Sequence, residues 1–192
     1  MGVPFRLYMM LLGCRPMGRF TEQHDVFFGI AQNPADLIPQ ILASWPEAKG
    51  KMHVDAIRAV SLVDGYEVRV VEKEQSAPLP DVQLFFLNLG GYTRNVFDEA
   101  HYKMLAVAPE KGEAIRKAKQ TAFYQHTGYK EAPSHIDDKY GVDVDDVYEI
   151  NDILAPEFKE RFSIQLIKSS LEKEDEIVLG YITFDKLKAL II

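Results

Sequence analysis

The sequence is poor in cysteine, in long apolar runs and in basic residues. Cysteine occurs once, at Cys14, so the chain cannot form an internal disulfide, and we expect a cytoplasmic protein. No stretch approaches the roughly 18 apolar residues of a membrane-spanning helix, so we expect no membrane partner. Acidic residues outnumber basic ones by 29 to 22, which gives a net charge of -7. Because phosphate binding requires a basic surface, we expect no nucleic-acid partner either.

The sequence also lacks the short motifs of common cofactor and metal sites. The glycines at 13, 90 and 91 follow predicted strands, but no helix begins directly behind them, so neither a dinucleotide fingerprint nor a phosphate-binding loop is present. There is no cysteine pair and no HExxH helix of the kind that binds zinc. We therefore expect no organic cofactor and keep a divalent metal as the one possible cofactor.

The sequence contains instead a short motif that occurs twice. Phe20–His24 (FTEQH) recurs 77 residues later as Phe97–His101 (FDEAH). Each copy follows an apolar run that ends in a glycine, Gly13 or Gly90, and each precedes a second apolar run. This pattern predicts an internal duplication.

A second alignment extends the duplication toward the C-terminus. A shift by 82 places His53 on His135 and Asp55 on Asp137, and six of the 16 columns from residue 53 to 68 are identical. Unrelated sequences would share about one. The difference between the two shifts predicts a single insertion of five residues in the second half, between its helix and the His-x-Asp element.

Each half has the pattern of a ββαββ unit. In the first half, two short apolar runs predict strands, an Asn-Pro pair predicts the start of a helix, and Asp64-Gly65 predicts a two-residue hairpin turn. In the second half, Asp146-Val147 takes the place of Asp-Gly, so we expect a longer or different turn there. The expected elements are Leu7–Leu12, Asp25–Ala31, Pro34–Trp45, Val60–Val63 and Tyr66–Val71, then Leu84–Leu89, Tyr102–Ala108, Gly112–Phe123 and Gly141–Ile150.

The remaining chain is expected to form a C-terminal β-hairpin. Phe162–Ser169 and Ile177–Phe184 flank a charged turn, and such a hairpin could cover a sheet edge, join the two halves or contact a second copy. The fold class is therefore α+β, with two tandem, β-grasp-like ββαββ repeats about a pseudo-twofold axis. The alternative is one continuous sheet shared by both halves. The expected divisions are residues 1–72 (first repeat), 73–83 (linker), 84–155 (second repeat) and 156–192 (hairpin extension).

Several of these strings resemble a known family. TEQHDVFFGIA, LFFLNLGGY, HIDDKYGVDVDDVYEI and the following Asp152-Ile153-Leu154 are similar to the domain-of-unknown-function family 1543, small bacterial proteins in which the unit can occur twice. The similarity extends over roughly residues 5–155. The family has no established activity, so the resemblance implies only that the repeated histidines and carboxylates belong to a shared pattern.

The repeated histidines and carboxylates are the candidate site residues. In extended backbone, residues two apart share a face, so Glu22 lies beside His24 and His53 beside Asp55. A carboxylate beside an imidazole fixes its tautomer and raises its basicity, as a general base or a metal ligand requires. It can equally be a structural lock in which the two groups satisfy each other. The candidates are Glu22, His24, His53, Asp55, Glu99, His101, His135 and Asp137.

Two further features have simpler interpretations. Asp137, Asp138, Asp143, Asp145 and Asp146 lack the spacing of a calcium-binding EF-hand, and we expect a solvated acidic edge. Cys14 aligns with Gly91, which favours a small residue tolerated at a turn over a thiolate nucleophile.

Two hypotheses of function follow. The first is a binding or assembly module, with an unknown protein or small molecule as partner and a homodimer as one possibility, in which the His/carboxylate pairs fix the loops. The second is a metal-assisted or acid–base hydrolase that uses the same residues.

Overall fold

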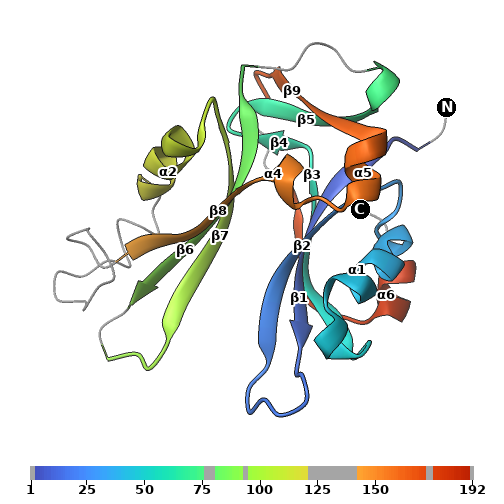
Figure 1. The fold of residues 1–192 in the computed structure, drawn as a ribbon, viewed down its shortest axis with the longest axis vertical. Coiled ribbons are helices and arrows are strands. Elements are labelled where there is room, and N and C mark those ends of the chain that lie inside the picture. The colour runs from blue at the N-terminus through green and yellow to red at the C-terminus, as the bar shows by residue number, and fades with distance from the viewer. Residues whose placement is uncertain (1–2, 76–80, 93–94, 121–141, 172–174, 191–192) are drawn as a thin grey trace. The chain divides into compact units, whose positions relative to one another are not determined.

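The computed structural model describes residues 3–75, 81–92, 95–120, 142–171 and 175–190. It divides into two compact units. Unit 1 comprises Met1–Leu79 and Leu154–Ile192, and unit 2 comprises Pro80–Ile153. The α+β class is confirmed, because sheets and short helices occur in both units (Figure 1).

The first sheet of unit 1 is antiparallel and carries the core of that unit. Its strand order is β10-β3-β1-β2. One face of β1 presents Tyr8, Met10 and Leu12, all almost fully buried. Gly29 on β2 lies opposite Tyr8 and faces the Leu37 side chain, so the helical segments cover this face. The strands are β1 (Arg6–Cys14), β2 (Gln23–Ala31), β3 (Met52–Val60) and β10 (Ile177–Ile182).

The helical cover begins where the sequence predicts it. Asn33 is extended, and its backbone N–H donates to the Asp36 carboxylate at 3.3 Å. The first turn is a 3₁₀ helix, η1 (Pro34–Leu37), and it continues into α1 (Ile38–Ser44) and a second 3₁₀ turn, η2 (Pro46–Ala48). The C-terminal α6 (Phe184–Lys188) packs against η1, and Figure 1 shows α1 and α6 side by side.

The second sheet of unit 1 contains the predicted hairpin. β4 (Leu62–Val63) and β5 (Tyr66–Glu72) pair across Asp64 and Gly65, both with left-handed φ values, 50° and 75°. Two consecutive left-handed residues form the turn that matches the twist of paired strands, which confirms the prediction. The 3₁₀ turn η3 (Lys73–Gln75) follows β5.

The C-terminal segment differs from its prediction. After α5 (Pro156–Arg161), β9 (Phe162–Lys168) pairs with β5, whereas β10 pairs with β3 in the other sheet. The two strands therefore do not form a hairpin with each other. Each instead extends a sheet, and β10 covers the edge that β3 would otherwise expose.

A buried carboxylate fixes the chain just before β10. Asp175 accepts hydrogen bonds from Arg58 Nε at 2.9 Å, from the backbone N–H of Ser61 at 3.0 Å and from that of Leu62 at 3.3 Å. The Asp175 side chain is only 4% exposed. This ion pair joins the start of β10 to β3 and to the turn that follows β3.

Unit 2 is a smaller three-stranded sheet with order β7-β6-β8. Alanines of α2 pack on leucine and phenylalanine side chains of β6, and the buried core residues are Phe85, Leu87, Leu89, Ala106, Ala108, Ala114 and Ala118. The elements are β6 (Gln83–Tyr92), β7 (Glu99–Ala108), α2 (Lys111–Lys119), β8 (Val142–Glu149) and α4 (Ile150–Ile153).

Two further expectations are corrected here. Asp146 and Val147 lie within β8 and form no turn, so the described part of the second half is ββαβ. The alternative of a single continuous sheet is wrong, since β6, β7 and β8 form a sheet of their own. The tandem repeat and its pseudo-twofold axis stay predictions. Within the described ranges, no helix is both long enough and apolar enough to span a membrane.

Candidate functional site

The first cluster of candidate residues is built around Gly13 on β1. His24 on β2 lies opposite Gly13 from one side, and His53 on β3 lies opposite it from the other. Residues directly opposite in antiparallel strands share a face, so both imidazoles stand on the sheet face away from η1 and α1.

A β-bulge brings Asp55 into the same place. Leu12 lies opposite Val54 and Leu11 lies opposite Ala56, so Asp55 is the extra residue of the bulge. In a regular strand Asp55 would lie opposite Leu11, but its Oδ2 lies directly over Gly13. The bulge therefore directs the carboxylate toward the two histidines.

Gly13 is required by the space that these side chains occupy. A methyl group at this position would overlap both His53 Nε2 and Asp55 Oδ2. Since Gly13 has no left-handed φ, the requirement is steric and not conformational. Gly13, which ends the apolar run, thus leaves the space that the side chains of the cluster occupy.

Four side chains converge over Gly13. His53 Nε2 lies 3.1 Å from Asp55 Oδ1, and His24 Nε2 lies 3.3 Å from Asp55 Oδ2. Glu22 closes the cluster, with Oε1 at 3.4 Å from His53 Nε2 and Oε2 at 3.9 Å from His24 Nε2. The structure therefore brings together all four candidate residues of the first half, from two segments about 30 residues apart. We call this set the unit 1 cluster.

The unit 1 cluster is closed on one side and open on the other. The His53 side chain is 6% exposed, and its ring lies 4.0 Å, centroid to centroid, from the ring of Tyr181 on β10. His24 and Glu22 are 42% and 46% exposed. One oxygen, Asp55 Oδ2, is buried and accepts no hydrogen bond within the described part of the chain.

Single nitrogen–oxygen pairs of the cluster have the separation of two ligands on one small metal ion. Four ligand atoms at about 2.0 to 2.1 Å from a tetrahedral zinc ion are about 3.3 to 3.4 Å apart. The pairs His24–Asp55, His53–Asp55 and His53–Glu22 have nitrogen–oxygen distances of 3.3, 3.1 and 3.4 Å, with His24 and His53 beside different oxygens of Asp55. A hydrogen-bonded lock would also bring nitrogen and oxygen together, but it requires a ring N–H aimed at the oxygen, and Asp55 Oδ2 receives none.

A second cluster lies over Gly90 in unit 2. His101 on β7 is opposite Gly90, and a bulge between Val144 and Asp146 on β8 carries Asp145. His101 Nε2 lies 3.3 Å from Asp145 Oδ2 and 4.0 Å from Glu99 Oε2. One ligand atom from each of Glu99, His101 and Asp145 lies within 4.8 Å of the other two. We call these three residues the unit 2 cluster.

The register corrects the alignment of the second half. Gly13 corresponds to Gly90, an offset of 77, but Asp55 corresponds in place to Asp145, an offset of 90. The insertion is therefore longer than the expected five residues. His135 and Asp137, the predicted counterparts, lie outside the described residues. Asp143 holds the register position of His53.

Asp145 is thus a candidate ligand that the sequence interpretation assigned to a solvated acidic edge. The signal that could have identified it is the Val-Asp pair, Val54-Asp55 and Val144-Asp145, followed in both strands by an apolar residue two positions on, Ile57 or Val147. An alignment on this pattern has fewer identical residues than the shift by 82, but it agrees with the observed strand pairing.

Cys14 does not belong to the candidate chemistry. Its side chain is buried on the helix-covered face, where burial, and then the negative charge of Glu22, raises the pKa of the thiol. A raised pKa disfavours the thiolate that a nucleophile requires. The structure therefore agrees with the expected role of a small residue near a turn.

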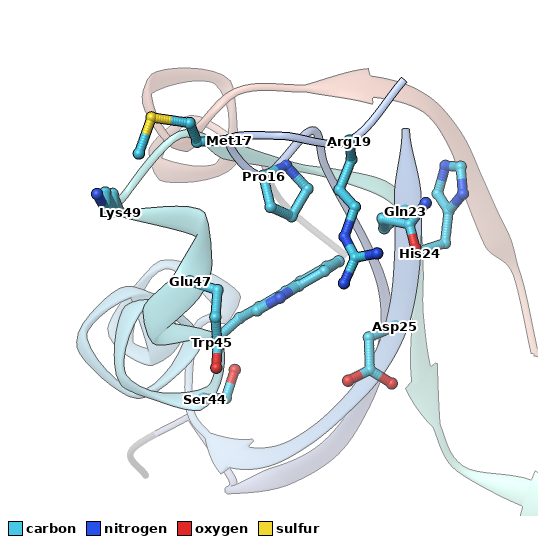
Figure 2. Close-up of a pocket in the computed structure, with 10 residues that line it drawn as sticks. All are labelled: Pro16, Met17, Arg19, Gln23, His24, Asp25, Ser44, Trp45, Glu47 and Lys49. Atoms are coloured by element: carbon cyan, nitrogen blue, oxygen red, sulfur yellow. The ribbon is translucent and has the colours of Figure 1, made fainter. Parts of the chain in front are cut away.

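The helix-covered side of the same strands carries a groove of about 670 Å³ (Figure 2). The Trp45 ring extends into it from the end of α1, beneath the Arg19 side chain, and Asp25 faces it from β2. His24 points to the other side of β2 from Asp25. No motif in the sequence predicted this groove. Its lining residues are Pro16, Met17, Arg19, Gln23, His24, Asp25, Ser44, Trp45, Glu47 and Lys49.

Comparison with known proteins supports the resemblance and adds no activity. Residues 19–70 match a family model described as Domain of Unknown Function (DUF1543), a segment that includes the whole unit 1 cluster. No curated protein was found to match. The crystal structure of a protein Il1583 from Idiomarina loihiensis is similar, with 17% identity and a TM-score of 0.62, over 93% of this chain and 97% of that one. At this identity the likeness shows the fold alone.

Proposed function

We propose that this protein is a metal-binding module in which Glu22, His24, His53 and Asp55 hold a divalent transition-metal ion. The observation that carries the proposal is the convergence of two imidazole nitrogens on one carboxylate, of which Oδ2 is buried without a hydrogen-bond donor. A cation between these atoms would satisfy that oxygen.

The donor set supports a transition metal over magnesium or calcium. Two neutral imidazoles with two carboxylates suit zinc and its neighbours in the first transition row, whereas magnesium and calcium prefer oxygen donors alone. The carboxylates would neutralise the charge of a divalent ion. The exposed side of the cluster, beside His24 and Glu22, leaves room for a further ligand such as water.

A purely structural lock explains the cluster less well. The hydrogen-bonded side chains of a structural lock should be buried, since water competes for exposed hydrogen bonds. Here two of the four side chains are more than two-fifths exposed. The alternative of a metal-assisted or acid–base hydrolase uses the same residues and stays a prediction.

Titration calorimetry of the full-length protein with zinc, after treatment with a chelator, tests the proposal. We expect saturable binding, and replacement of a ligand by an isosteric residue, as in His53→Gln or Asp55→Asn, should weaken it at least about tenfold. Cobalt substitution gives an independent readout, because its visible absorption reports coordination geometry.

Asp25→Asn is the matched control for Asp55→Asn. It removes the same charge from β2, on the opposite face from the cluster. We expect its zinc affinity to be unchanged. If both variants weakened binding equally, the effect would come from net charge alone, and if wild-type protein took up no metal, the lock would be the correct interpretation.

A further inference from the structure

We infer that the two clusters take different classes of cation: a nitrogen-preferring ion such as zinc in unit 1, and an oxygen-preferring ion such as manganese, held more weakly, in unit 2. This inference rests on the proposed function. It concerns the relative preference of each site, since zinc exceeds manganese in affinity at nearly any site of nitrogen and oxygen donors.

The donor sets differ although the backbones that carry them correspond. Both clusters lie over a glycine, and both have a Glu-x-His segment on one neighbouring strand and a bulge aspartate on the other. The unit 1 cluster has two imidazoles, His24 and His53. Among the described residues, the unit 2 cluster has one imidazole, His101, with two carboxylates, and the backbone of Asp143 holds the register position of the second histidine. Each imidazole replaced by a carboxylate shifts preference from zinc toward manganese or magnesium.

The support behind the ligands differs as well. In unit 1, β10 covers the edge of β3, and Tyr181 contacts the His53 ring. In the described residues of unit 2, β8 is an edge strand with no further strand beside it. His53 of unit 1 is nearly buried, although His24 and Glu22 are more exposed than the three unit 2 ligands, which are each about one-third exposed. A site with a fixed, desolvated ligand loses less freedom on binding, so the unit 1 cluster should also be the tighter one.

Single-cluster variants of the full-length chain allow each site to be measured alone. His101→Gln leaves unit 1 intact, and His24→Gln leaves unit 2 intact. Manganese binding is followed by loss of the six-line electron paramagnetic resonance signal of the free ion, and zinc affinity is obtained by competition against bound manganese. We expect the ratio of zinc to manganese affinity to be at least about tenfold higher in unit 1, as expected for one imidazole exchanged for a carboxylate.

Exchange of the distinguishing residue gives a second measurement. His53→Asp should lower the zinc-to-manganese ratio of unit 1. His53 is buried, so its variant could disturb folding. His24→Asp provides the same test at a half-exposed position, where a substitution disturbs packing less. Tyr181→Ala should weaken metal binding in unit 1 and leave unit 2 unchanged, while Tyr181→Phe, which keeps the ring contact, should retain it.

The possible results distinguish the inference of different cation preferences from the proposal that the protein binds metal. Equal ratios in both single-cluster variants, or ratios that do not respond to the exchanges, would overturn the inference while the metal-binding proposal stands. Absence of any metal binding in the His101→Gln variant would overturn both.

Discussion

Replacement of Gly13 by alanine tests whether the unit 1 cluster requires a residue without a side chain at this position. The added methyl group would overlap His53 Nε2 and Asp55 Oδ2. His53 has little room to move, because it is nearly buried and lies against Tyr181. Overpacking of this kind typically costs about 1 to 3 kcal/mol, and we expect Gly13→Ala to lie in the upper half of that range.

Two other glycines provide graded controls. A methyl group on Gly90 would overlap the Asp145 carboxylate, whose side chain is 32% exposed, so we expect a smaller loss of about 1 kcal/mol. A methyl group on Gly112 in α2 would meet nothing closer than Glu110 at 3.7 Å. Alanine exceeds glycine in helix propensity by about 1 kcal/mol, so Gly112→Ala should be neutral or stabilising.

Urea unfolding followed by far-ultraviolet circular dichroism gives the order of stability. The expected order, from most to least stable, is Gly112→Ala, wild type, Gly90→Ala and Gly13→Ala. Zinc binding measured on folded Gly13→Ala protein should also be weakened, because the two donor atoms are displaced. A Gly13→Ala protein as stable as wild type, with unchanged zinc affinity, would refute the placement of His53 and Asp55 over this glycine.

Three further predictions concern the metal, the buried ion pair and the thiol. Zinc at about 100 times its dissociation constant should raise the free energy of unfolding by about 2.7 kcal/mol, with chelator reversing the shift in melting temperature; no shift would contradict binding to the folded state. Asp175→Ala should cost about 3 kcal/mol in urea unfolding, since it leaves Arg58 without its buried partner, whereas Asp185→Ala, at a surface pair with Lys188, should change stability by less than about 1 kcal/mol. Cys14 should react with a thiol reagent at pH 8 far more slowly in native protein than in urea, because burial raises its pKa and blocks access; equal rates would contradict its burial.

Local signals predicted the local structure of this protein well. The start of the first helix and the turn at Asp64-Gly65 depend on φ preferences and backbone capping that a few residues determine. The pairing of Glu22 with His24, and of His53 with Asp55, was also predicted, because residues two apart in a strand share a face. The convergence of the two pairs depends on the register of β2 and β3 on β1.

Strand partners and register could not be predicted in the same way. Apolar runs specify that β9 and β10 are strands, but their partners depend on contacts with residues about 100 positions away, β5 and β3. The shift by 82 differs for a related reason from the strand register, in which Asp145 follows Asp55 by 90 residues. It counted identical residues, whereas the position of a ligand in a sheet depends on pairing, and a bulge shifts that pairing by one residue without a clear signal in the sequence.

The arrangement of the unit 1 ligands along the chain has a consequence for the groove on the opposite face. A metal ion that joins His24 to His53 would act as a crosslink that closes a loop of roughly 30 residues, and a crosslink of that length restricts the unfolded chain by about 3.6 kcal/mol in the chain-entropy estimate. That loop contains α1 and five of the ten residues that line the groove: Asp25, Ser44, Trp45, Glu47 and Lys49. Metal in the unit 1 cluster would therefore limit local unfolding of the groove, which shares His24 with the cluster.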